Sequence, residues 1–221
     1  MIYFITGASD RLGCELAKLL LEDGEKVVGL SRTKPDYEVD FLKLDLTNED
    51  SIREAANEIA KTDGEISLVN CAGVMARETE NNFAEISRVF LTNTMGPILL
   101  ENLLFDKIRV EGGEFVNIIS TSATRGDIRQ PIYSSSKWGL RGFTLGLSER
   151  LKGSRARAIS FVPGGFLSRM AEKIDKQIAD PENWAPVADV AKMLYEVLKT
   201  PRTVEISEIV VNRKYEIKEE Q

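Results

Sequence analysis

The chain has 221 residues, of which 43% are hydrophobic and 29% are charged, and its net charge is -6 at pH 7. A chain of this length can bury a substantial core, and we expect a single domain over residues 1–221. The negative charge argues against nucleic acid or an anionic membrane surface as a partner. No histidine occurs in the sequence, which excludes Ser/His/Asp hydrolysis and histidine-ligated metals. Tyrosine, lysine, aspartate or glutamate would have to transfer protons.

The apolar runs are interrupted well short of the ~20 residues that a membrane-spanning helix needs. Residues 1–5 carry neither the basic segment nor the cleavage region of a signal peptide. Cys14 and Cys71 are widely separated, which fits reduced thiols better than a disulfide framework or a zinc site. We therefore expect a cytoplasmic protein with no membrane segment and no bound metal.

The first part of the chain alternates short apolar runs with segments of helical periodicity. Residues 2–5 are a predicted strand that stops at Thr6-Gly7, and leucines at helical spacing follow it as far as Gly24. Strands are predicted at 26–30 and 41–44. The next helix can be capped by Thr47 or by Asn48, and a fourth strand follows at 66–69.

The second part continues the alternation. A helical pattern runs from Asn82 to about Phe105, and Gly96-Pro97 must kink or divide it. Strands at 114–119 and 158–162 enclose a helix that reaches about Leu151, and a late helix at 187–198 precedes a final strand at 205–211. Residues 218–221 are polar, and we expect them to be frayed.

Strands that alternate with helices over the whole length predict an α/β fold. Its sheet would be mostly parallel, with about seven strands and with helices on both faces. Sheets of this kind bind ligands at the carboxyl ends of their strands. Functional residues are therefore expected where the predicted strands end.

Tyr133 and Lys137 lie four residues apart at the start of a predicted helix. Positions i and i+4 share one helix face, so the phenol and the ammonium should project into the same space. A positive charge beside a tyrosine favours the phenolate and lowers its pKa, which makes Tyr133 a candidate acid/base. Taken alone, the pair is more often an ordinary polar helix surface.

Further polar and glycine-containing segments follow the predicted strands. The turn from Thr6 to Gly13 joins the first strand to the first helix, where free backbone NH groups and the helix dipole can hold a pyrophosphate. Glycines permit that close approach, although any tight turn into a helix could look similar. The fourth and fifth strands end in Asn70-Cys71-Ala72-Gly73 and Ser120-Thr121-Ser122. Together with Tyr133 and Lys137, these segments indicate one site.

In their order and spacing these motifs resemble the short-chain dehydrogenase/reductase family over nearly the whole chain. The family pattern is Thr-Gly-x-x-x-Gly-x-Gly, Asn-Asn-Ala-Gly, a mid-chain Asn, a Ser, Tyr-x-x-x-Lys and Pro-Gly. The resemblance implies a Rossmann-like doubly wound fold that binds NAD(P). It also implies hydride transfer between nicotinamide and a ketone, an aldehyde or a secondary alcohol.

The resemblance assigns roles to four residues. It implies that Tyr133 donates a proton in reduction or accepts one in oxidation. It implies that Ser120, thirteen residues before Tyr133 and therefore favoured over Ser122, hydrogen-bonds the substrate oxygen. Lys137 would lower the tyrosine pKa and hold the nicotinamide ribose, and Asn93 would order a water in the proton relay. Donors around the oxygen suit the reaction because hydride transfer to a carbonyl builds negative charge there.

The resemblance also implies a cofactor site. Asp45, after the third strand, matches the adenine contact of the family, which we favour over the alternative that it caps the following helix. The implied cofactor-binding residues are Gly7, Ser9, Arg11, Leu12, Gly13, Arg32, Asp45, Leu46, Asn70, Ala72, Gly73, Tyr133, Lys137, Pro163, Gly164, Phe166 and Ser168.

The choice between NADP and NAD depends on the end of the second strand. That strand ends in Ser31-Arg32 and lacks the acidic residue that would accept hydrogen bonds from an NAD ribose. An arginine at this place can pair with a 2′-phosphate. We therefore predict NADP, with NAD as a possible cofactor.

Two positions depart from the family pattern. Cys71 replaces the second asparagine of Asn-Asn-Ala-Gly, which is a mild change. Arg11 stands where the middle glycine of the cofactor loop is usual. Its side chain could swing outward and offer a guanidinium to a phosphate, or it could weaken binding. The second outcome would favour an alternative function, a nucleotide-binding regulatory or scaffold protein without useful turnover.

The substrate side is less specific. The resemblance implies a variable lid over residues 167–186, which would order on substrate binding. It implies a small-molecule carbonyl or alcohol substrate, which the sequence does not name. It further implies a homodimer or homotetramer that pairs through the helices at 82–105 and 133–151. Residues that could line the pocket are Met75, Thr121, Ser122, Phe166, Leu167, Met170 and Trp184, with Arg125 or Arg129 at the mouth. Taken singly, each of them is more often a core or surface residue than a ligand contact.

Overall fold

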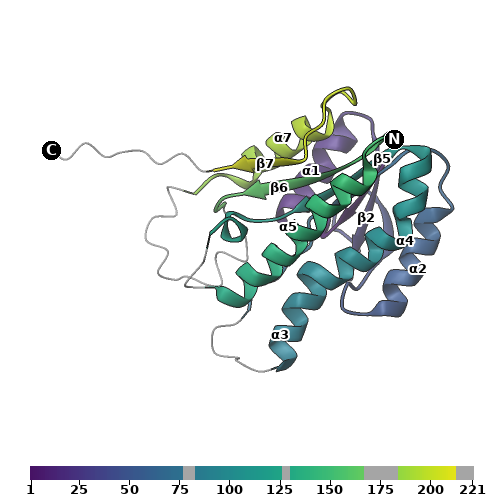
Figure 1. Ribbon diagram of the computed structural model, residues 1–221. Helices are drawn as coiled ribbons and strands as arrows, with labels where there is room; N and C mark the ends of the chain where they lie inside the picture. Colours follow the sequence, from purple (N-terminus) through teal and green to yellow (C-terminus); the bar gives the residue numbers. More distant parts are fainter. Residues whose placement is uncertain (77–82, 126–129, 167–183, 213–221) are drawn as a thin grey trace.

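The computed structural model describes residues 1–76, 83–125, 130–166 and 184–212. Within these ranges the centre of the protein is a seven-stranded sheet in the order β3-β2-β1-β4-β5-β6-β7, with parallel neighbours throughout (Figure 1). The strands are β1 Ile2–Thr6, β2 Lys26–Ser31, β3 Asp40–Lys43, β4 Ile66–Asn70, β5 Gly113–Ile118, β6 Ala156–Pro163 and β7 Glu208–Val211. The predicted doubly wound α/β fold is confirmed.

Helices cover both faces of this sheet (Figure 1). The helices are α1 Arg11–Glu22, α2 Glu49–Ala60, α3 Phe83–Phe90, α4 Gly96–Glu111, α5 Pro131–Leu151 and α7 Val187–Leu198. Side chains of β1 alternate between the two faces, as the two-residue period of a strand requires. Ile5 packs with α1 and α7, whereas Phe4 packs with α2, α4 and α5. The sheet is therefore buried on both sides, which explains why its strands read as continuous apolar runs.

The helix α2 begins with a side-chain cap. Asn48 Oδ1 accepts a hydrogen bond of 2.8 Å from the backbone NH of Ser51, so Asn48 is the cap and Thr47 is not. Glu49 and Asp50 follow in the first turn, where carboxylates interact favourably with the helix dipole.

The predicted division at Gly96-Pro97 takes the form of a change in helix type. The chain stays helical from Phe83 to Glu111, which is six residues beyond the predicted end, but Leu91–Met95 form a π-helix. The Gly96 NH donates to the Leu91 carbonyl, five residues earlier. Pro97 lies at the start of α4, where its missing NH is tolerated. A Cβ on Gly96 would lie 2.4 Å from the Leu46 carbonyl oxygen, so glycine is needed for this close approach.

The carboxyl ends of all seven strands lie at one edge of the sheet, and β1 separates β2 from β4 there. The strand order reverses at this point, which is where doubly wound sheets bind ligands.

The final strand β7 is shorter than predicted and starts at Glu208. Most of the predicted lid, 167–183, and the predicted frayed end, 218–221, lie outside the described residues. No helix of the described chain is both long and apolar enough to cross a membrane.

Candidate active site

Tyr133 and Lys137 lie next to each other at the start of α5. The helix begins at Pro131, so Tyr133 falls in its first turn and Lys137 one turn later. Both side chains are buried, with exposed fractions of 8% and 3%. Lys137 Nζ is 6.0 Å from the centre of the Tyr133 ring and donates a hydrogen bond of 2.7 Å to the Ile118 carbonyl. The structure therefore brings the two predicted residues together beside the carboxyl end of β5.

Burial changes the protonation of Lys137. Loss of solvation lowers the pKa of its ammonium to about 8, and the nearby Cys71 acts weakly in the opposite direction. Burial also raises the pKa of the Cys71 thiol to about 12, with Lys137 opposing the shift. At neutral pH this pair is therefore mostly an ammonium beside a neutral thiol, and the positive charge is lost as the pH rises through about 8.

Asn93 lies in the π-helix and is fully buried. Its Oδ1 accepts from the Val74 NH at 2.8 Å, and its Nδ2 donates to the Val74 carbonyl at 2.7 Å and to Ser136 Oγ at 3.0 Å. The side chain thus ties the loop after β4 to α5. Both side-chain NH groups are used in these contacts, so a water ordered by Asn93, as predicted, would have to donate to a carbonyl oxygen of this residue.

Ser120 follows β5 and caps the short 3-10 turn Thr121–Ala123, where its Oγ accepts from the Ser122 NH at 3.2 Å. Two contacts from α5 hold this turn. Ser134 Oγ donates to the Ser122 carbonyl at 2.6 Å, and Arg141 Nη1 donates to the Ala123 carbonyl at 3.0 Å. The predicted serine is thereby fixed to the helix that carries Tyr133.

Arg141 also joins this turn to the edge of the sheet. Its Nε and Nη2 donate to the two carboxylate oxygens of Glu208 on β7, each at 2.7 Å. This two-bond geometry is the strong form of an arginine–carboxylate contact. Neither residue was among the predicted site residues, because the contact joins positions that are far apart in the sequence.

The glycine turn after β1 is closely packed. Gly7 has a φ of 72°, and a Cβ on it would lie 2.9 Å from the Ala72 Cα. A Cβ on Gly13 would lie 2.6 Å from the Gly7 carbonyl oxygen. Of the predicted cofactor residues, Gly7 therefore packs against both Ala72 and Gly13, and these contacts are made largely by main-chain atoms. Ser9 lies in the same glycine turn, and Leu12 lies in the first turn of α1.

Arg11 has a φ of 39°, which makes it the only residue other than glycine with a positive φ in the described chain. The left-handed region costs a non-glycine residue roughly 1–2 kcal/mol. The backbone here thus keeps a conformation that glycine adopts readily, even though the side chain is long. The side chain itself is partly exposed at the start of α1.

The segment after β4 lies between the glycine turn and Lys137. The Ala72 NH donates to Thr6 Oγ1 at 3.1 Å. A Cβ on Gly73 would lie 3.5 Å from Lys137 Nζ and 3.6 Å from Asn93 Oδ1. Asn70 differs from these neighbours because its side chain is 1% exposed and faces the interior. Any contact of Asn70 with a cofactor would therefore be made by its main chain.

The predicted adenine end lies where β2 and β3 end. Asp45 Oδ1 accepts from the Thr47 NH at 2.9 Å and from the Thr47 hydroxyl at 2.7 Å. Burial acts to raise the pKa of the Asp45 carboxyl, but the Thr47 hydrogen bonds and the charges of Arg32 and Lys43 outweigh it, so the pKa is lowered. Arg32 is exposed. Leu46 is buried.

A tyrosine that was not among the predicted site residues contacts the glycine turn from the loop between β2 and β3. Tyr37, in the loop between β2 and β3, donates from its hydroxyl to the Ala8 carbonyl at 2.9 Å. Burial raises the pKa of this phenol, so Tyr37 remains a neutral donor.

The last of the predicted cofactor-binding residues lie at the end of β6 and directly after it. Pro163 ends that strand, and the Gly164 NH donates to the Val211 carbonyl at 2.7 Å. Phe166 forms an isolated parallel bridge with Ala185. A Cβ on Gly165 would lie 3.3 Å from the Trp184 ring, so the predicted pocket residue Trp184 packs at this place. Ser168 lies outside the described residues, as do Leu167, Met170 and Arg129.

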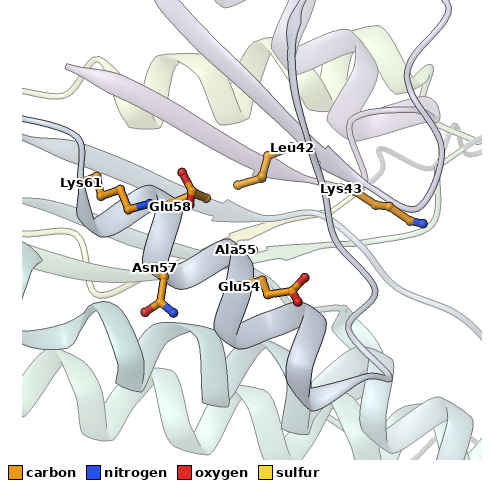
Figure 2. A pocket seen from close by; sticks show the side chains of 7 residues that line it. All are labelled: Leu42, Lys43, Glu54, Ala55, Asn57, Glu58 and Lys61. Atoms are coloured by element: carbon orange, nitrogen blue, oxygen red, sulfur yellow. Dashed lines mark hydrogen bonds and ion pairs between the residues drawn. The ribbon is translucent and has the colours of Figure 1, made fainter.

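A hollow elsewhere on the surface contains none of the predicted site residues. It has a volume of about 650 Å³ and lies between β3 and α2 (Figure 2). Two of its charged side chains, Glu58 and Lys61, form an exposed ion pair of 2.6 Å. The lining residues are Leu42, Lys43, Glu54, Ala55, Asn57, Glu58 and Lys61. This hollow is therefore not the site at which the predicted residues meet.

Comparison with known proteins identifies the family. The model of the short chain dehydrogenases matches residues 1–179. The chain belongs to this family. Short-chain dehydrogenases are oxidoreductases that bind NAD(P), so this chain is an oxidoreductase of that kind, which implies a small-molecule substrate.

Relatives and a solved structure agree with this assignment. The chain is 28% identical over 214 residues to carbonyl reductase family member 4 of Danio rerio, a match that covers 89% of this chain and 90% of the relative. It is 33% identical over 178 residues to the benzil reductase ((S)-benzoin forming) of Bacillus subtilis, covering 74% and 73%. An alcohol dehydrogenase from the archaeon Thermococcus sibiricus, complexed with 5-hydroxy-NADP, superposes with a TM-score of 0.83 at 20% identity, covering 99% of each chain. At that identity, the structural match supports the fold.

Proposed function

We propose that this short-chain dehydrogenase is an NADP(H)-dependent carbonyl reductase with Tyr133 as its acid/base. Its substrate would be a ketone or an aldehyde, or a secondary alcohol in the opposite direction. The supporting observation is the buried pair of Tyr133 and Lys137, whose ring centre and Nζ are 6.0 Å apart. Lys137 lies beside Gly73, and the preceding residue, Ala72, packs on Gly7 in the glycine turn. An acid/base and a nucleotide-binding surface thus adjoin at one edge of the sheet.

The residues at this edge fit a dinucleotide. The packing of Gly7 against Ala72, and of Gly13 against Gly7, leaves no room for side chains at these two positions, and it brings the ends of β1 and β4 close to the start of α1. The first turn of α1 follows, and the side chain of its N-cap residue Asp10 makes no capping hydrogen bond. Backbone NH groups of that turn would hold the pyrophosphate. When bound, the nicotinamide supplies or accepts the hydride.

The side chains of the chain divide the remaining work. Tyr133 would donate its proton to the carbonyl oxygen as negative charge develops there, and Ser120 would hydrogen-bond the same oxygen. Lys137 would favour the resulting tyrosinate by its positive charge. The ammonium has three donors, of which one is directed to Ile118, and a ribose hydroxyl would accept another. Asn93 would support this arrangement by holding Val74 against α5.

A screen of NADPH oxidation against a panel of ketones and aldehydes tests this function. We expect turnover with at least one class of carbonyl. The alternative function, a nucleotide-binding regulatory or scaffold protein, is supported by the unfavourable backbone conformation of Arg11 in the cofactor turn. It would be indicated by NADPH binding without turnover across the whole panel.

Arg32→Ala is expected to weaken NADPH binding by about tenfold and to leave NADH binding nearly unchanged. Arg32 is exposed where β2 ends, and its charge acts on Asp45 at the predicted adenine end. A guanidinium paired with a phosphate contributes on the order of 1–3 kcal/mol. Binding titrations with both cofactors measure the change, and Lys34→Ala in the same loop is the matched control. A wild-type protein that prefers NADH would contradict the assignment of NADP.

Arg11 can be tested with two variants that separate its charge from its backbone. Arg11→Ala and Arg11→Gly are both expected to weaken NADPH binding several-fold and to reduce its salt dependence, because both remove the guanidinium. Arg11→Gly alone should also raise the free energy of unfolding by about 1 kcal/mol, since it relieves the positive φ. Unchanged NADPH affinity in both variants would mean that the Arg11 side chain points to solvent and does not contact the cofactor.

Homo-oligomerisation is part of the proposal. Large apolar side chains are exposed on α4 and α5, including Leu103 at 39%, Val110 at 68%, Trp138 at 43% and Leu145 at 38%. Leu145→Glu is expected to shift the protein toward monomer in light scattering, because a buried unpaired charge would oppose pairing. Val204→Glu is the control, since Val204 is 50% exposed and lies on neither helix. A monomeric wild-type protein would refute this part.

A further inference from the structure

A chain of buried polar side chains runs beneath the proposed site. It joins Thr6 on β1, Asn70 on β4, Glu101 on α4, Asn117 on β5 and Thr144 on α5, and none of these residues is more than 1% exposed. Asn70 Nδ2 donates to Glu101 Oε1 at 2.8 Å and to Asn117 Oδ1 at 3.0 Å. Asn117 Nδ2 donates to Thr144 Oγ1 at 2.8 Å. Asn70 is therefore the junction at which helix and strands are connected.

The upper end of this chain reaches the surface assigned to the cofactor. Thr6 Oγ1 donates to Asn70 Oδ1 at 3.5 Å, and the same Thr6 oxygen accepts from the Ala72 NH at 3.1 Å. Ala72 in turn packs on Gly7, where an added Cβ would lie 2.9 Å from the Ala72 Cα. The orientation of the Asn70 side chain is thus coupled, through two hydrogen bonds, to the main chain at the ends of β1 and β4.

Glu101 is the unusual member of the chain. One carboxyl oxygen accepts from Asn70, and Oε2 has no hydrogen-bond partner among the described residues. Burial raises the pKa of Glu101 to about 8, and hydrogen bonds from Asn117 and Asn70 oppose the shift only in part. A buried acid without a counter-ion costs stability, so its presence calls for an explanation other than packing.

The charged groups on the neighbouring elements are directed elsewhere. Lys137 on α5 donates to Ile118, and Lys107 on α4 pairs with Glu111. Glu114 on β5 pairs with Arg157 at the opposite end of the sheet. No charge from these groups contributes to the pKa shift of Glu101 in the described structure. The acid therefore acts on its surroundings through hydrogen bonds from neutral amides, of which the one from Asn70 leads to the glycine turn.

We propose that Glu101 is a positioning residue for the cofactor, because its hydrogen bond to Asn70 fixes the Thr6–Ala72 contact and with it the glycine turn. This inference rests on the proposed function, since the surface of Gly7 and Ala72 is assigned there to the dinucleotide. The neutral acid accepts from Asn70 without a buried charge. The ionised form places an uncompensated charge at the same position, and we infer that it disturbs the turn.

Two substitutions of Glu101 test the proposal. Glu101→Gln keeps an acceptor for Asn70 and removes the titration, and Glu101→Leu removes the acceptor. The measurements are NADPH affinity at about pH 6.5 and about pH 9, on either side of the Glu101 pKa, and the exchange rate of the Ala72 amide in the free protein. Glu114→Gln is the control, because it alters a buried acid on β5 that lies far from the proposed site.

At the lower pH, Glu101→Gln should match the wild-type protein. At the higher pH it should bind NADPH several-fold more tightly than the wild-type protein, while the loss of the Lys137 charge affects both equally. Glu101→Leu should bind NADPH about tenfold more weakly than the wild-type protein at the lower pH, as expected when a buried donor loses its acceptor, and should accelerate Ala72 exchange. At the higher pH the difference should be smaller, because the wild-type protein is itself weakened there. Glu114→Gln should leave the pH dependence of binding as it is in the wild-type protein.

The proposal is overturned if the affinity ratio of Glu101→Gln to wild type is the same at both pH values, or if Glu101→Leu changes neither binding nor exchange. A wild-type protein that binds no NADPH would refute the proposed function instead. In that case Ala72 exchange in the free protein still decides whether Glu101 holds the turn.

Discussion

Tyr133→Phe is expected to lower kcat for carbonyl reduction by about 10²–10⁴-fold, the usual contribution of a general acid. Phenylalanine fills the same buried space next to Lys137 but has no proton to donate. NADPH affinity should change little, because the lysine and the glycine turn remain. Single-turnover kinetics under saturating NADPH measures the chemical step directly.

The control for this variant is Tyr195→Phe, which removes a phenol from α7, a helix on the opposite face of the sheet from α5. Its activity should equal that of the wild-type protein. If Tyr133→Phe retained full activity, Tyr133 would not be the acid/base, and a different proton donor would have to be sought among the residues at this edge.

Lys137→Met is expected to reduce kcat/KM for NADPH-dependent reduction by at least about a hundredfold. The variant loses both the charge that favours the tyrosinate and the donor assigned to the ribose, so KM for NADPH should rise as kcat falls. Methionine preserves most of the apolar stem in a fully buried position, which limits loss of stability. Lys152→Met, at an exposed ion pair with Glu149, is the control.

The pKa of Lys137 also predicts a pH dependence. Because burial lowers this pKa to about 8, the ammonium is present below that pH and is lost as the pH rises through it. The kcat/KM for reduction in the wild-type protein should therefore decline above about pH 8. Measuring the profile in Glu101→Gln removes the other group that titrates in this range. A profile that stays flat through this range would show that the Lys137 charge is not required.

Local sequence patterns were sufficient to predict the sheet. The strands β1 and β4 each extend one residue beyond the predicted end. Their ends were predictable because a glycine follows the apolar run of β1 closely and an asparagine follows that of β4. The pairing of Tyr133 with Lys137 also follows from local geometry, since positions i and i+4 of any helix share a face. The α/β order of the elements then determined which edge of the sheet would carry these residues.

Contacts between distant segments were beyond such patterns. The π-helix around Asn93 coincides with hydrogen bonds to Val74, nineteen residues earlier, which helical periodicity does not predict. The inward-facing side chain of Asn70 likewise makes hydrogen bonds to residues that are distant in the sequence, Glu101 among them. One local signal was present in the sequence, because Glu101 is a charged residue on the otherwise apolar, buried stripe of α4 that includes Leu100 and Leu104.

The ion pair between Arg141 and Glu208 connects the proposed active site to the last strand of the sheet. Arg141 contacts the serine turn through Ala123, and its partner lies on β7, at the edge of the sheet. A chain cut before Glu208 would lose the carboxylate that orients this arginine, and the edge of β6 would be uncovered as well. Partial digestion that removes β7 should therefore lower turnover.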